Sequence, residues 1–273
     1  MASAPVLSAR PVPGDPVAIE WLARRIAANR FLPVPPRERC FVGDGDYRSI
    51  GAEFLSLFVQ LGHLAPTDQV LDVGCGIGRM AVPLTQYLEG DGGCYEGIDV
   101  VVDGIDWCRR AITVRYPGFR FRRLDAFHPE YNPGGRPLTE LGALPYGSAG
   151  FDFAVLTSVI THLHPGDVKF YAAELGRLLR PGGRAFLSLF LLSAESRAAL
   201  AQGDRRLAFE ADDPATVQYS DPAHPLAAVA YDEAELLAWF AAAGLSLFAP
   251  VTRGTWSGLT GTSYQDICVL AKA

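Results

Sequence analysis

From Gln69 to the C-terminus, short apolar runs alternate with stretches in which apolar residues recur every three or four positions. The short runs predict buried strands, and the second pattern predicts helices with one apolar face. Strands are expected at 69–73, 94–100, 119–124, 151–159, 184–192, 245–251 and 264–272, and helices at 78–88, 104–116, 167–179 and 232–244. This alternation predicts a doubly wound α/β fold, in which a mostly parallel sheet is covered on both faces and ligands bind at the carboxyl ends of the strands.

Two further helical patterns precede this alternation, at 17–32 and 50–64. We expect residues 1–49 to form an N-terminal extension with a short lid helix, and residues 50–273 to form the main domain. Two stretches rich in proline, glycine or polar residues, 127–150 and 193–225, interrupt the alternation. Because long loops in compact domains are commonly functional and both stretches follow the carboxyl ends of strands, they are predicted to be cap insertions that shape a substrate pocket.

Composition narrows the choice of partners. The net charge of −6 argues against nucleic acid, because no excess of positive charge is available to neutralise phosphates. The five cysteines are scattered and lack a C-x-x-C spacing, so neither a disulfide framework nor a zinc ribbon is indicated. No apolar run reaches the roughly 18 to 20 residues of a transmembrane helix, and the N-terminus lacks the pattern of a secretory signal. These features favour a cytoplasmic protein without membrane contact.

The segment "VLDVGCGIGRM" (70–80) joins a predicted strand to a predicted helix through a glycine-rich turn. Gly74, Gly76 and Gly78 suit a backbone that turns sharply and lets a ligand approach without meeting a Cβ atom. Their G-x-G-x-G spacing differs from the G-x-G-x-x-G fingerprint of nicotinamide-dinucleotide enzymes. Asp72 stands just before them, where a carboxylate would face a cationic ligand better than a pyrophosphate.

Acidic residues also mark the ends of the next two predicted strands. Asp99, 25 residues beyond Gly74, could accept both hydroxyls of a ribose, and Asp125 could accept a hydrogen bond from an adenine amino group. Each acid has a structural alternative, since Asp72 could cap the following turn, Asp99 could be a solvated strand-end acid and Asp125 could cap a helix. The joint spacing of glycines and acids along three strand ends is nevertheless a specific signal for a nucleoside-containing cofactor.

These segments resemble the class I S-adenosylmethionine-dependent methyltransferases, from about Ile50 to the C-terminus. The resemblance rests on "LDVGCGIGR", "GIDV", "RLDAF", "FDFAVLTSVITHL" and "ELGRLLRPGGRAFLS". It implies a Rossmann-like sheet of seven strands whose last strand is antiparallel, supplied here by "SYQDICVLAKA". It also implies S-adenosylmethionine as the cofactor.

The resemblance further implies which residues contact that cofactor. They are Asp72, Gly74, Cys75, Gly76, Gly78, Arg79, Asp99, Val100, Asp125 and Ala126, with Thr157 beneath the sulfonium and Tyr47 closing over the site. Cys75 is expected to be a small residue near the ligand and not a nucleophile, because no general base is spaced to activate it. An exposed loop position remains an alternative for Tyr47.

The segment "TSVITHLHPGDV" (157–168) supplies the catalytic candidates. In the family this segment, which follows the fourth strand, borders the methyl group, so His162 and His164 are candidate general bases. A structural role is the alternative for each. A metal site is not expected, because no third ligand lies nearby in the sequence.

The acceptor is predicted to be a small molecule of a biosynthetic pathway, methylated on oxygen, nitrogen or carbon. Tyr131 and Trp256 are predicted to form an aromatic wall for it, and Trp107 and Trp239 to pack in the core or cap. Three alternatives remain: a sugar or peptide side chain as acceptor, an NAD-type oxidoreductase, and a binding module with a vestigial cofactor site. The oligomeric state stays open.

Overall fold

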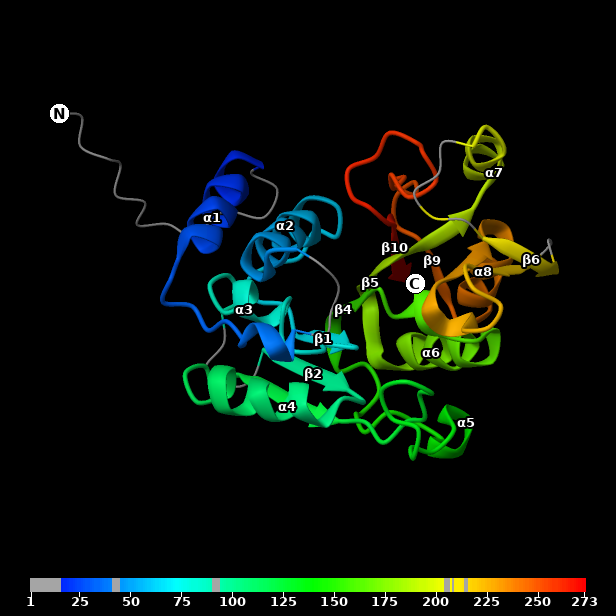
Figure 1. The fold of residues 1–273 in the computed structure, drawn as a ribbon. Helices are drawn as coiled ribbons and strands as arrows, with labels where there is room; N and C mark the ends of the chain where they lie inside the picture. The colour runs from blue at the N-terminus through cyan, green and yellow to red at the C-terminus, as the bar shows by residue number, and fades with distance from the viewer. Residues whose placement is uncertain (1–15, 41–44, 90–93, 204–206, 208, 214–215) are drawn as a thin grey trace.

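A sheet of seven strands forms the centre of the molecule in the computed structural model, which describes residues 16–40, 45–89, 94–203, 207, 209–213 and 216–273 (Figure 1). The spatial order is β3-β2-β1-β4-β5-β10-β9. The first five strands in this order pair in parallel, and β10 is antiparallel to both neighbours. Their bounds are β1 Val70–Val73, β2 Tyr95–Asp99, β3 Phe119–Arg123, β4 Phe151–Thr157, β5 Leu179–Leu192, β9 Leu245–Leu247 and β10 Asp266–Lys272. The predicted Rossmann-like sheet with an antiparallel last strand is confirmed.

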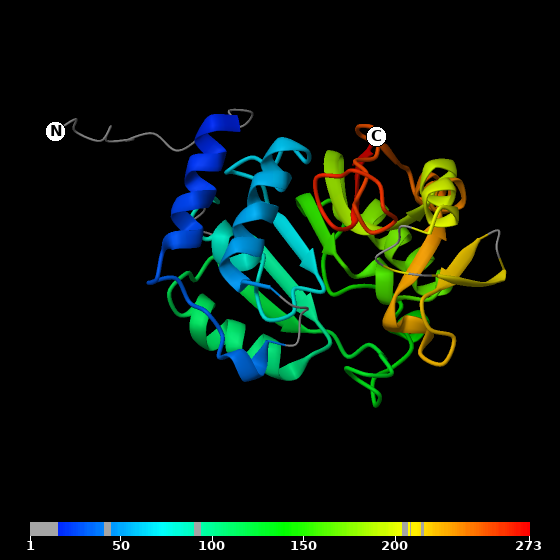
Figure 2. The same cartoon turned by 45° about the horizontal axis from the view of Figure 1, so that its top comes forward.

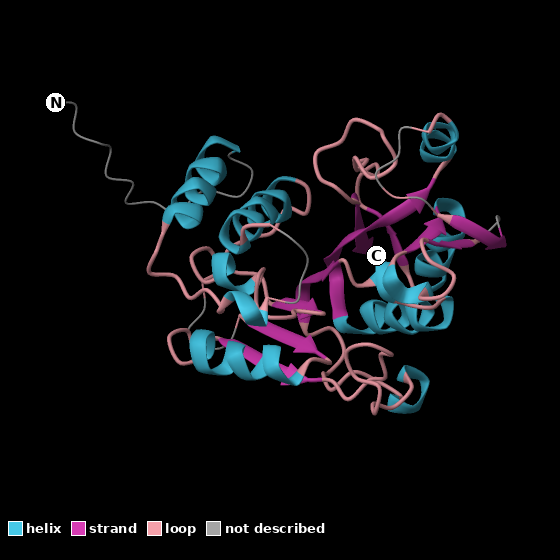
Figure 3. Ribbon diagram, viewed as in Figure 1, coloured by secondary structure: helices cyan, strands magenta, loops and turns pink. Residues whose placement is uncertain are grey.

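Helices cover both faces of this sheet (Figure 3). Successive residues of a strand point to opposite faces, so Val70 and Phe153 belong to one hydrophobic core and their neighbours Leu71 and Ala154 to the other. The first core includes residues of α1 (Pro16–Ala28), α2 (Tyr47–Gln60), α3 (Ala81–Leu84) and α4 (Val102–Cys108). The second includes residues of α5 (Leu138–Leu141), α6 (Pro165–Leu178) and α8 (Glu233–Ala242). Strands buried on both faces explain the nearly continuous apolar runs in the sequence.

Two of the predicted helices are shorter or less regular than expected. The pattern at 78–88 contains only one short α-helix, α3, followed by turns. Pro83 lies within it and cannot donate a backbone hydrogen bond to the preceding turn. The pattern at 104–116 begins as α4 and continues as a π-helical turn, η2 (Arg109–Thr113).

The second predicted cap insertion is an extension of the sheet (Figure 2). The last residues of β5 pair in parallel with β8 (Val229–Asp232), which pairs with β7 (Val217–Tyr219), which pairs with β6 (Glu210–Asp213). Helix α7 (Ala194–Ala201) and the short 3₁₀ helix η4 (Pro225–Ala227) connect these strands. Residues 193–225, predicted to be a polar cap insertion, thus contain α7, β6 and β7, and β8, which follows them, was not predicted. A third, smaller apolar cluster includes Phe190 of β5, Ala230 of β8 and Trp256.

Helix α2 packs on the sheet, where Phe58 meets Phe153 and Phe186, and α1 packs against α2. Asp46 caps α2 by accepting a hydrogen bond from the backbone N–H of Ser49. Helix α1 buries Ile19 and Ile26 in the first core. The predicted extension also includes residues 1–15 and 41–44, which lie outside the described residues. Among the residues that are described, no helix is long and apolar enough to cross a membrane.

Candidate active site

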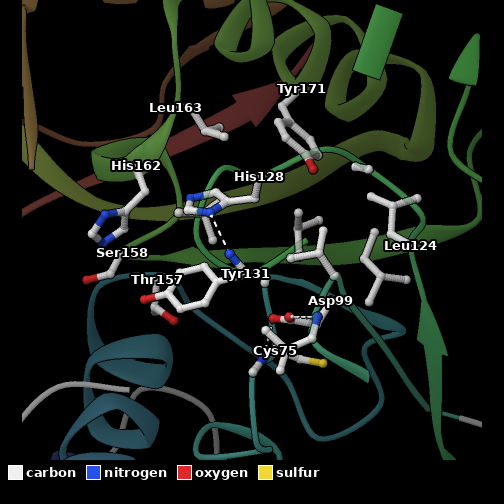
Figure 4. Close-up of a pocket in the computed structure, with 18 of the residues that line it drawn as sticks. Cys75, Asp99, Leu124, His128, Tyr131, Thr157, Ser158, His162, Leu163 and Tyr171 are labelled. Atoms are coloured by element: carbon white, nitrogen blue, oxygen red, sulfur yellow. Dashed lines mark hydrogen bonds between the residues drawn. The ribbon is translucent and has the colours of Figure 1, made fainter. Parts of the chain in front are cut away.

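The carboxyl ends of strands β1 to β4 open onto one cavity of about 430 Å³ (Figure 4). Figure 4 shows Asp99 and Cys75 at one end of it and His162 and His128 at the other. Eight of the predicted cofactor-binding residues line the cavity: Gly74, Cys75, Gly76, Arg79, Asp99, Val100, Ala126 and Thr157. Four predicted residues do not: Tyr47, Asp72, Gly78 and Asp125. The fold therefore brings most of the predicted set to one site, at the edge of the sheet where ligands were expected.

The turn after β1 has a backbone that favours glycine. Gly74, Gly76 and Gly78 all have positive φ, at 73°, 53° and 74°. A Cβ atom on Gly74 would also collide with Cγ2 of Val159, from the segment after β4. The N–H groups of Gly74 and Cys75 donate to the carbonyl of Ile98 on β2. The turn is thus held tightly against the neighbouring strand and presents bare backbone to the cavity.

Asp99 ties this turn to the end of β2. Its Oδ2 accepts from the N–H of Gly76 at 2.7 Å, and its Oδ1 accepts from the N–H of Val101 at 2.8 Å. Burial raises the pKa of Asp99 above its usual range, and the backbone hydrogen bonds oppose that shift. Each carboxylate oxygen can accept a further hydrogen bond, so Asp99 can still receive hydroxyl donors from a ligand. Burial and the nearby Asp99 raise the pKa of the Cys75 thiol well above its usual value, which fits a packing role.

Asp72 lies behind the turn, and not on the cavity wall. It is fully buried, and its Oδ2 accepts a hydrogen bond from the hydroxyl of Tyr95. Its Oδ1 has no hydrogen-bond partner among the described residues. Burial, with a smaller contribution from the charge on Asp99, raises the pKa of Asp72 to about 7. The predicted direct contact with the cofactor is therefore not what the geometry favours, and Asp72 would act from behind the backbone.

Tyr47 also lies behind the glycine turn. Its side chain is buried, its ring meets the edge of Trp107, and its hydroxyl donates to the carbonyl of Ile77 at 2.9 Å. Tyr47 was predicted to close over the cofactor, but in this structure α2 turns its side chain into the core and away from the cavity wall. Gly78 is nearby and is also absent from the cavity wall, and a Cβ atom there would meet Cδ1 of Ile112 at 2.6 Å.

Asp125 points away from the cavity, whereas its neighbour Ala126 lines it. The Asp125 carboxylate is exposed and accepts from Arg123 at 3.2 Å and from the amide of Asn132 at 3.3 Å. The same Asn132 amide donates to the carbonyl of Ala126 at 2.8 Å. The first insertion (127–150) thus folds back onto the end of β3. Its Asn132 binds the carboxylate that was predicted to bind adenine. Apolar contacts from Leu124 and Ala126 remain available on that wall.

His162 ends a short 3₁₀ helix, η3 (Ile160–His162), and lines the cavity. Its Nδ1 lies 2.8 Å from the carbonyl of Leu226, in η4 of the sheet extension. Because a carbonyl can only accept, Nδ1 carries the proton and Nε2 of the neutral ring holds a lone pair. A second hydrogen bond joins the sheet extension to the segment that follows β4. The hydroxyl of Tyr231 on β8 donates it to the carbonyl of Leu163.

His164 does not reach this site. It is exposed at the start of α6, where its backbone carbonyl accepts from the N–H groups of Asp167 and Val168. It is absent from the cavity wall. The intervening Leu163 sends the two histidines in different directions, so only His162 remains a catalytic candidate.

His128, in the first insertion, was missed as a site residue. It lines the cavity and stacks on Tyr131, with ring centroids 4.6 Å apart. Its Nδ1 accepts from the N–H groups of Glu130 and Tyr131, both at 3.2 Å. Burial lowers the pKa of His128, and the neighbouring His162 lowers it further. The only sequence signal was its position just after a strand end, at the start of the proline- and glycine-rich insertion.

Of the aromatic residues predicted to enclose the acceptor, Tyr131 lines the cavity and Trp256 does not. Trp256 is fully buried, and its ring packs on Phe190 while its Nε1 donates to Asp266 at 2.8 Å. Trp107 packs in the first core, and Trp239 packs edge-on against Tyr231, as the sequence interpretation expected. Among the described residues, no group of three histidine, cysteine, aspartate or glutamate side chains could hold a metal ion.

Comparisons with known proteins agree with this geometry. A family model described as a methyltransferase domain matches residues 45–249. A fatty-acid O-methyltransferase of Mycolicibacterium smegmatis is 35% identical over 115 residues, which are 42% of this chain and 34% of that protein. A probable methyltransferase of Aspergillus luteorubrus is 28% identical over 127 residues, 45% of this chain and 40% of the other. The chain thus matches well under half the length of these curated relatives.

Solved structures share the fold at low sequence identity. A Pyrococcus horikoshii protein superposes with a TM-score of 0.57 at 16% identity, over 86% of this chain and 95% of that one. The Burkholderia thailandensis 1,6-didemethyltoxoflavin-N1-methyltransferase, solved with its substrate and S-adenosylhomocysteine, superposes with a TM-score of 0.52 at 20% identity, over 100% of this chain and 93% of that one. The family match decides against the NAD-type oxidoreductase. The chain belongs to the family that this model describes, the methyltransferase domain family.

Proposed function

We propose that the protein transfers the methyl group of S-adenosylmethionine to a small, largely apolar acceptor, and that His162 takes the proton which the acceptor releases. The observation that carries this proposal is the 2.8 Å hydrogen bond between Nδ1 of His162 and the carbonyl of Leu226. It holds the imidazole in one tautomer, with the lone pair on Nε2. A neutral imidazole in a fixed orientation is a suitable general base near neutral pH.

The residues at the other end of the cavity fit the cofactor. Gly74 and Gly76 leave backbone without Cβ atoms at the wall, and Asp99 retains lone pairs for the ribose hydroxyls. Leu124 and Ala126 would pack against the adenine. When bound, S-adenosylmethionine supplies a methyl group activated by the adjoining sulfonium. The buried Asp72 carboxyl behind the turn suits a ligand that carries positive charge.

The protein's part in the reaction is to align the acceptor and to remove its proton. The acceptor atom forms a bond to the methyl carbon, and the bond from that carbon to sulfur breaks with its electron pair left on sulfur. Nε2 of His162 takes the proton from the acceptor. Holding the reactants in line accounts for much of the rate of such a displacement, and the general base contributes a further ~10²- to 10⁴-fold.

Several features support a small acceptor. The cavity volume of about 430 Å³ lies within the range of small-molecule sites, on the order of 300 to 1,000 Å³. Apolar side chains contribute much of its wall, among them Ile50, Phe54, Leu138 and Leu163. The matched relative from Mycolicibacterium smegmatis is named for fatty acids, and the structurally similar Burkholderia enzyme for a toxoflavin precursor. We expect a metabolite of a biosynthetic pathway before a sugar or a peptide side chain.

The test uses labelled methyl from S-adenosylmethionine with a panel of small phenols, enols and amines, and with protein and RNA fractions. Label should enter small molecules. His162→Asn keeps a donor for the Leu226 carbonyl but removes the base, so kcat with the best acceptor should fall ~10²- to 10⁴-fold while the affinity for S-adenosylhomocysteine changes little. Label found only in the protein or RNA fraction, or an unchanged kcat, would overturn the proposal.

A further inference from the structure

The imidazoles of His128 and His162 lie at the acceptor end of the cavity, opposite the end that Asp99 and Cys75 line (Figure 4). They differ in which ring nitrogen carries the proton. Nδ1 of His128 already accepts from two backbone N–H groups, so the proton of the neutral ring lies on Nε2. In His162 the proton lies on Nδ1, and Nε2 is the bare nitrogen. The rings are close enough to interact electrostatically, and Figure 4 shows them together on the cavity wall. One end of the cavity therefore has two imidazoles, one with a proton on Nε2 and one with a lone pair on Nε2.

The Nε2–H group of His128 lacks an acceptor among the described residues, and Nε2 is buried. Leaving a buried donor unpaired costs free energy, so a native structure that keeps one calls for an explanation, such as a ligand atom. The ring cannot easily turn away, because it is stacked on Tyr131 and held at Nδ1 by the backbone of that residue and of Glu130.

We infer that His128 is a specificity-determining residue that selects acceptors carrying a carbonyl oxygen next to the reactive hydroxyl, such as phenols with an ortho carbonyl group and enolised dicarbonyl compounds. The hydroxyl donates to Nε2 of His162, and the carbonyl accepts from Nε2–H of His128. This inference rests on the proposed role of His162.

The same geometry disfavours a carboxylate as acceptor. Because burial lowers the pKa of His128, its ring is neutral near pH 7 and offers a hydrogen bond without a charge. A carboxylate needs no base and would gain nothing from the lone pair of His162. Among the described residues that line the cavity, Arg79 is the one arginine or lysine, and it follows the glycine turn at the cofactor end.

Two isomeric probes differ only in the position of the carbonyl group relative to the hydroxyl group. 2-Hydroxyacetophenone carries the carbonyl next to the hydroxyl, and 4-hydroxyacetophenone carries it across the ring. Their binding to the complex with S-adenosylhomocysteine is measured by calorimetry, and their methylation by kcat/KM. The wild-type protein should prefer the ortho isomer about tenfold in both measurements, since a buried donor goes unpaired with the para isomer.

Matched variants assign the preference to one nitrogen. His128→Asn keeps an acceptor for the backbone N–H groups but has nothing at the place of Nε2, and should bring the ratio close to one. His128→Gln restores a donor near that place and should recover part of the preference. His63→Asn is the control, because His63 lies outside the cavity and its φ of 52° suits asparagine. It should leave the ratio unchanged.

The outcomes separate this inference from the proposed function. Equal use of both isomers by the wild-type protein, or an unchanged ratio in His128→Asn, would overturn the role of His128 and leave that of His162 standing. Binding and methylation of neither isomer would also overturn it. Methyl transfer to protein or RNA alone would overturn both proposals.

Nitrogen-15 spectra of the imidazoles in the complex with S-adenosylhomocysteine give a test that needs no acceptor. At pH 8, His128 should be protonated at Nε2 and His162 at Nδ1. The reverse tautomer at His128 would contradict the inference.

Discussion

The two ends of the cavity are built differently. At the cofactor end, the contacts join residues close to one another in the strand order, such as the carboxylate of Asp99 to the N–H groups of Gly76 and Val101. At the acceptor end, His162 depends on the carbonyl of Leu226, 64 residues further along the chain, and His128 comes from an insertion. The cofactor end is thus formed by the strands of the sheet and the turns that follow them. The acceptor end depends on the first insertion and on the sheet extension.

This difference indicates how one fold accommodates many acceptors. The extension that begins at the end of β5 can change without disturbing β1 and β2, because it contacts the site through η4 and β8. Function in such folds resides in the loops that a rigid scaffold positions. Changes at the cofactor end should therefore affect folding and cofactor affinity, and changes at the acceptor end should affect turnover and selectivity.

The largest effect on the cofactor end is expected for Gly74→Ala. The new Cβ atom would collide with Val159 and would also impose φ of 73° on alanine. We expect the free energy of unfolding to fall by about 4 kcal/mol and the affinity for S-adenosylhomocysteine by about 100-fold. Denaturant unfolding and calorimetric titration measure the two effects.

Gly244→Ala provides the matched control. Gly244, which follows the C-terminal cap of α8, has a similar φ, 79°, but nothing lies within 4 Å of the added Cβ atom. It should lose about 1 to 2 kcal/mol of stability through backbone strain and keep its cofactor affinity. Equal losses in the two variants would show that close packing of the turn on Val159 is unimportant, and the contrast between the two ends would lose its main support.

A smaller, pH-dependent effect is expected at Asp72. Its pKa in the folded protein is raised from 3.8 to about 7, so between these values the folded state binds the proton more tightly than the unfolded chain. Stability relative to Asp72→Asn should therefore be lost as the pH rises from about 4 to about 7, by about 3 to 4 kcal/mol. Unfolding free energies of both proteins from pH 4 to 8 test this, with the exposed Asp103→Asn as the control for net charge. A constant difference would contradict it.

The sequence predicted the cofactor end better than the acceptor end for physical reasons. Strand periodicity and the spacing of Gly74, Gly76 and Asp99 are local signals, and they were enough for the alternating α/β pattern and the turn, whereas the antiparallel last strand was implied by the family resemblance. The roles of His128 and Trp256 depend on which segments fold back onto the sheet, and no local pattern contains that information. The orientation of Asp125 was missed for the same reason, since Asn132 of the insertion binds its carboxylate.

The smallest predicted effect concerns Tyr47. It distinguishes a side chain that closes over the cofactor from one that supports the glycine turn from behind. Tyr47→Phe removes the hydroxyl that donates to the carbonyl of Ile77, and should lower the free energy of unfolding by about 1 kcal/mol with a change below about threefold in affinity for S-adenosylhomocysteine. Tyr87→Phe, which loses a similar bond to the carbonyl of Leu64 away from the cavity, is the matched control. If Tyr47 instead closed over the cofactor, affinity would fall while stability stayed near that of the wild-type protein. The N-terminal segment would then be grouped with the segments added to the sheet at the acceptor end. It would not be part of the structure that supports the glycine turn.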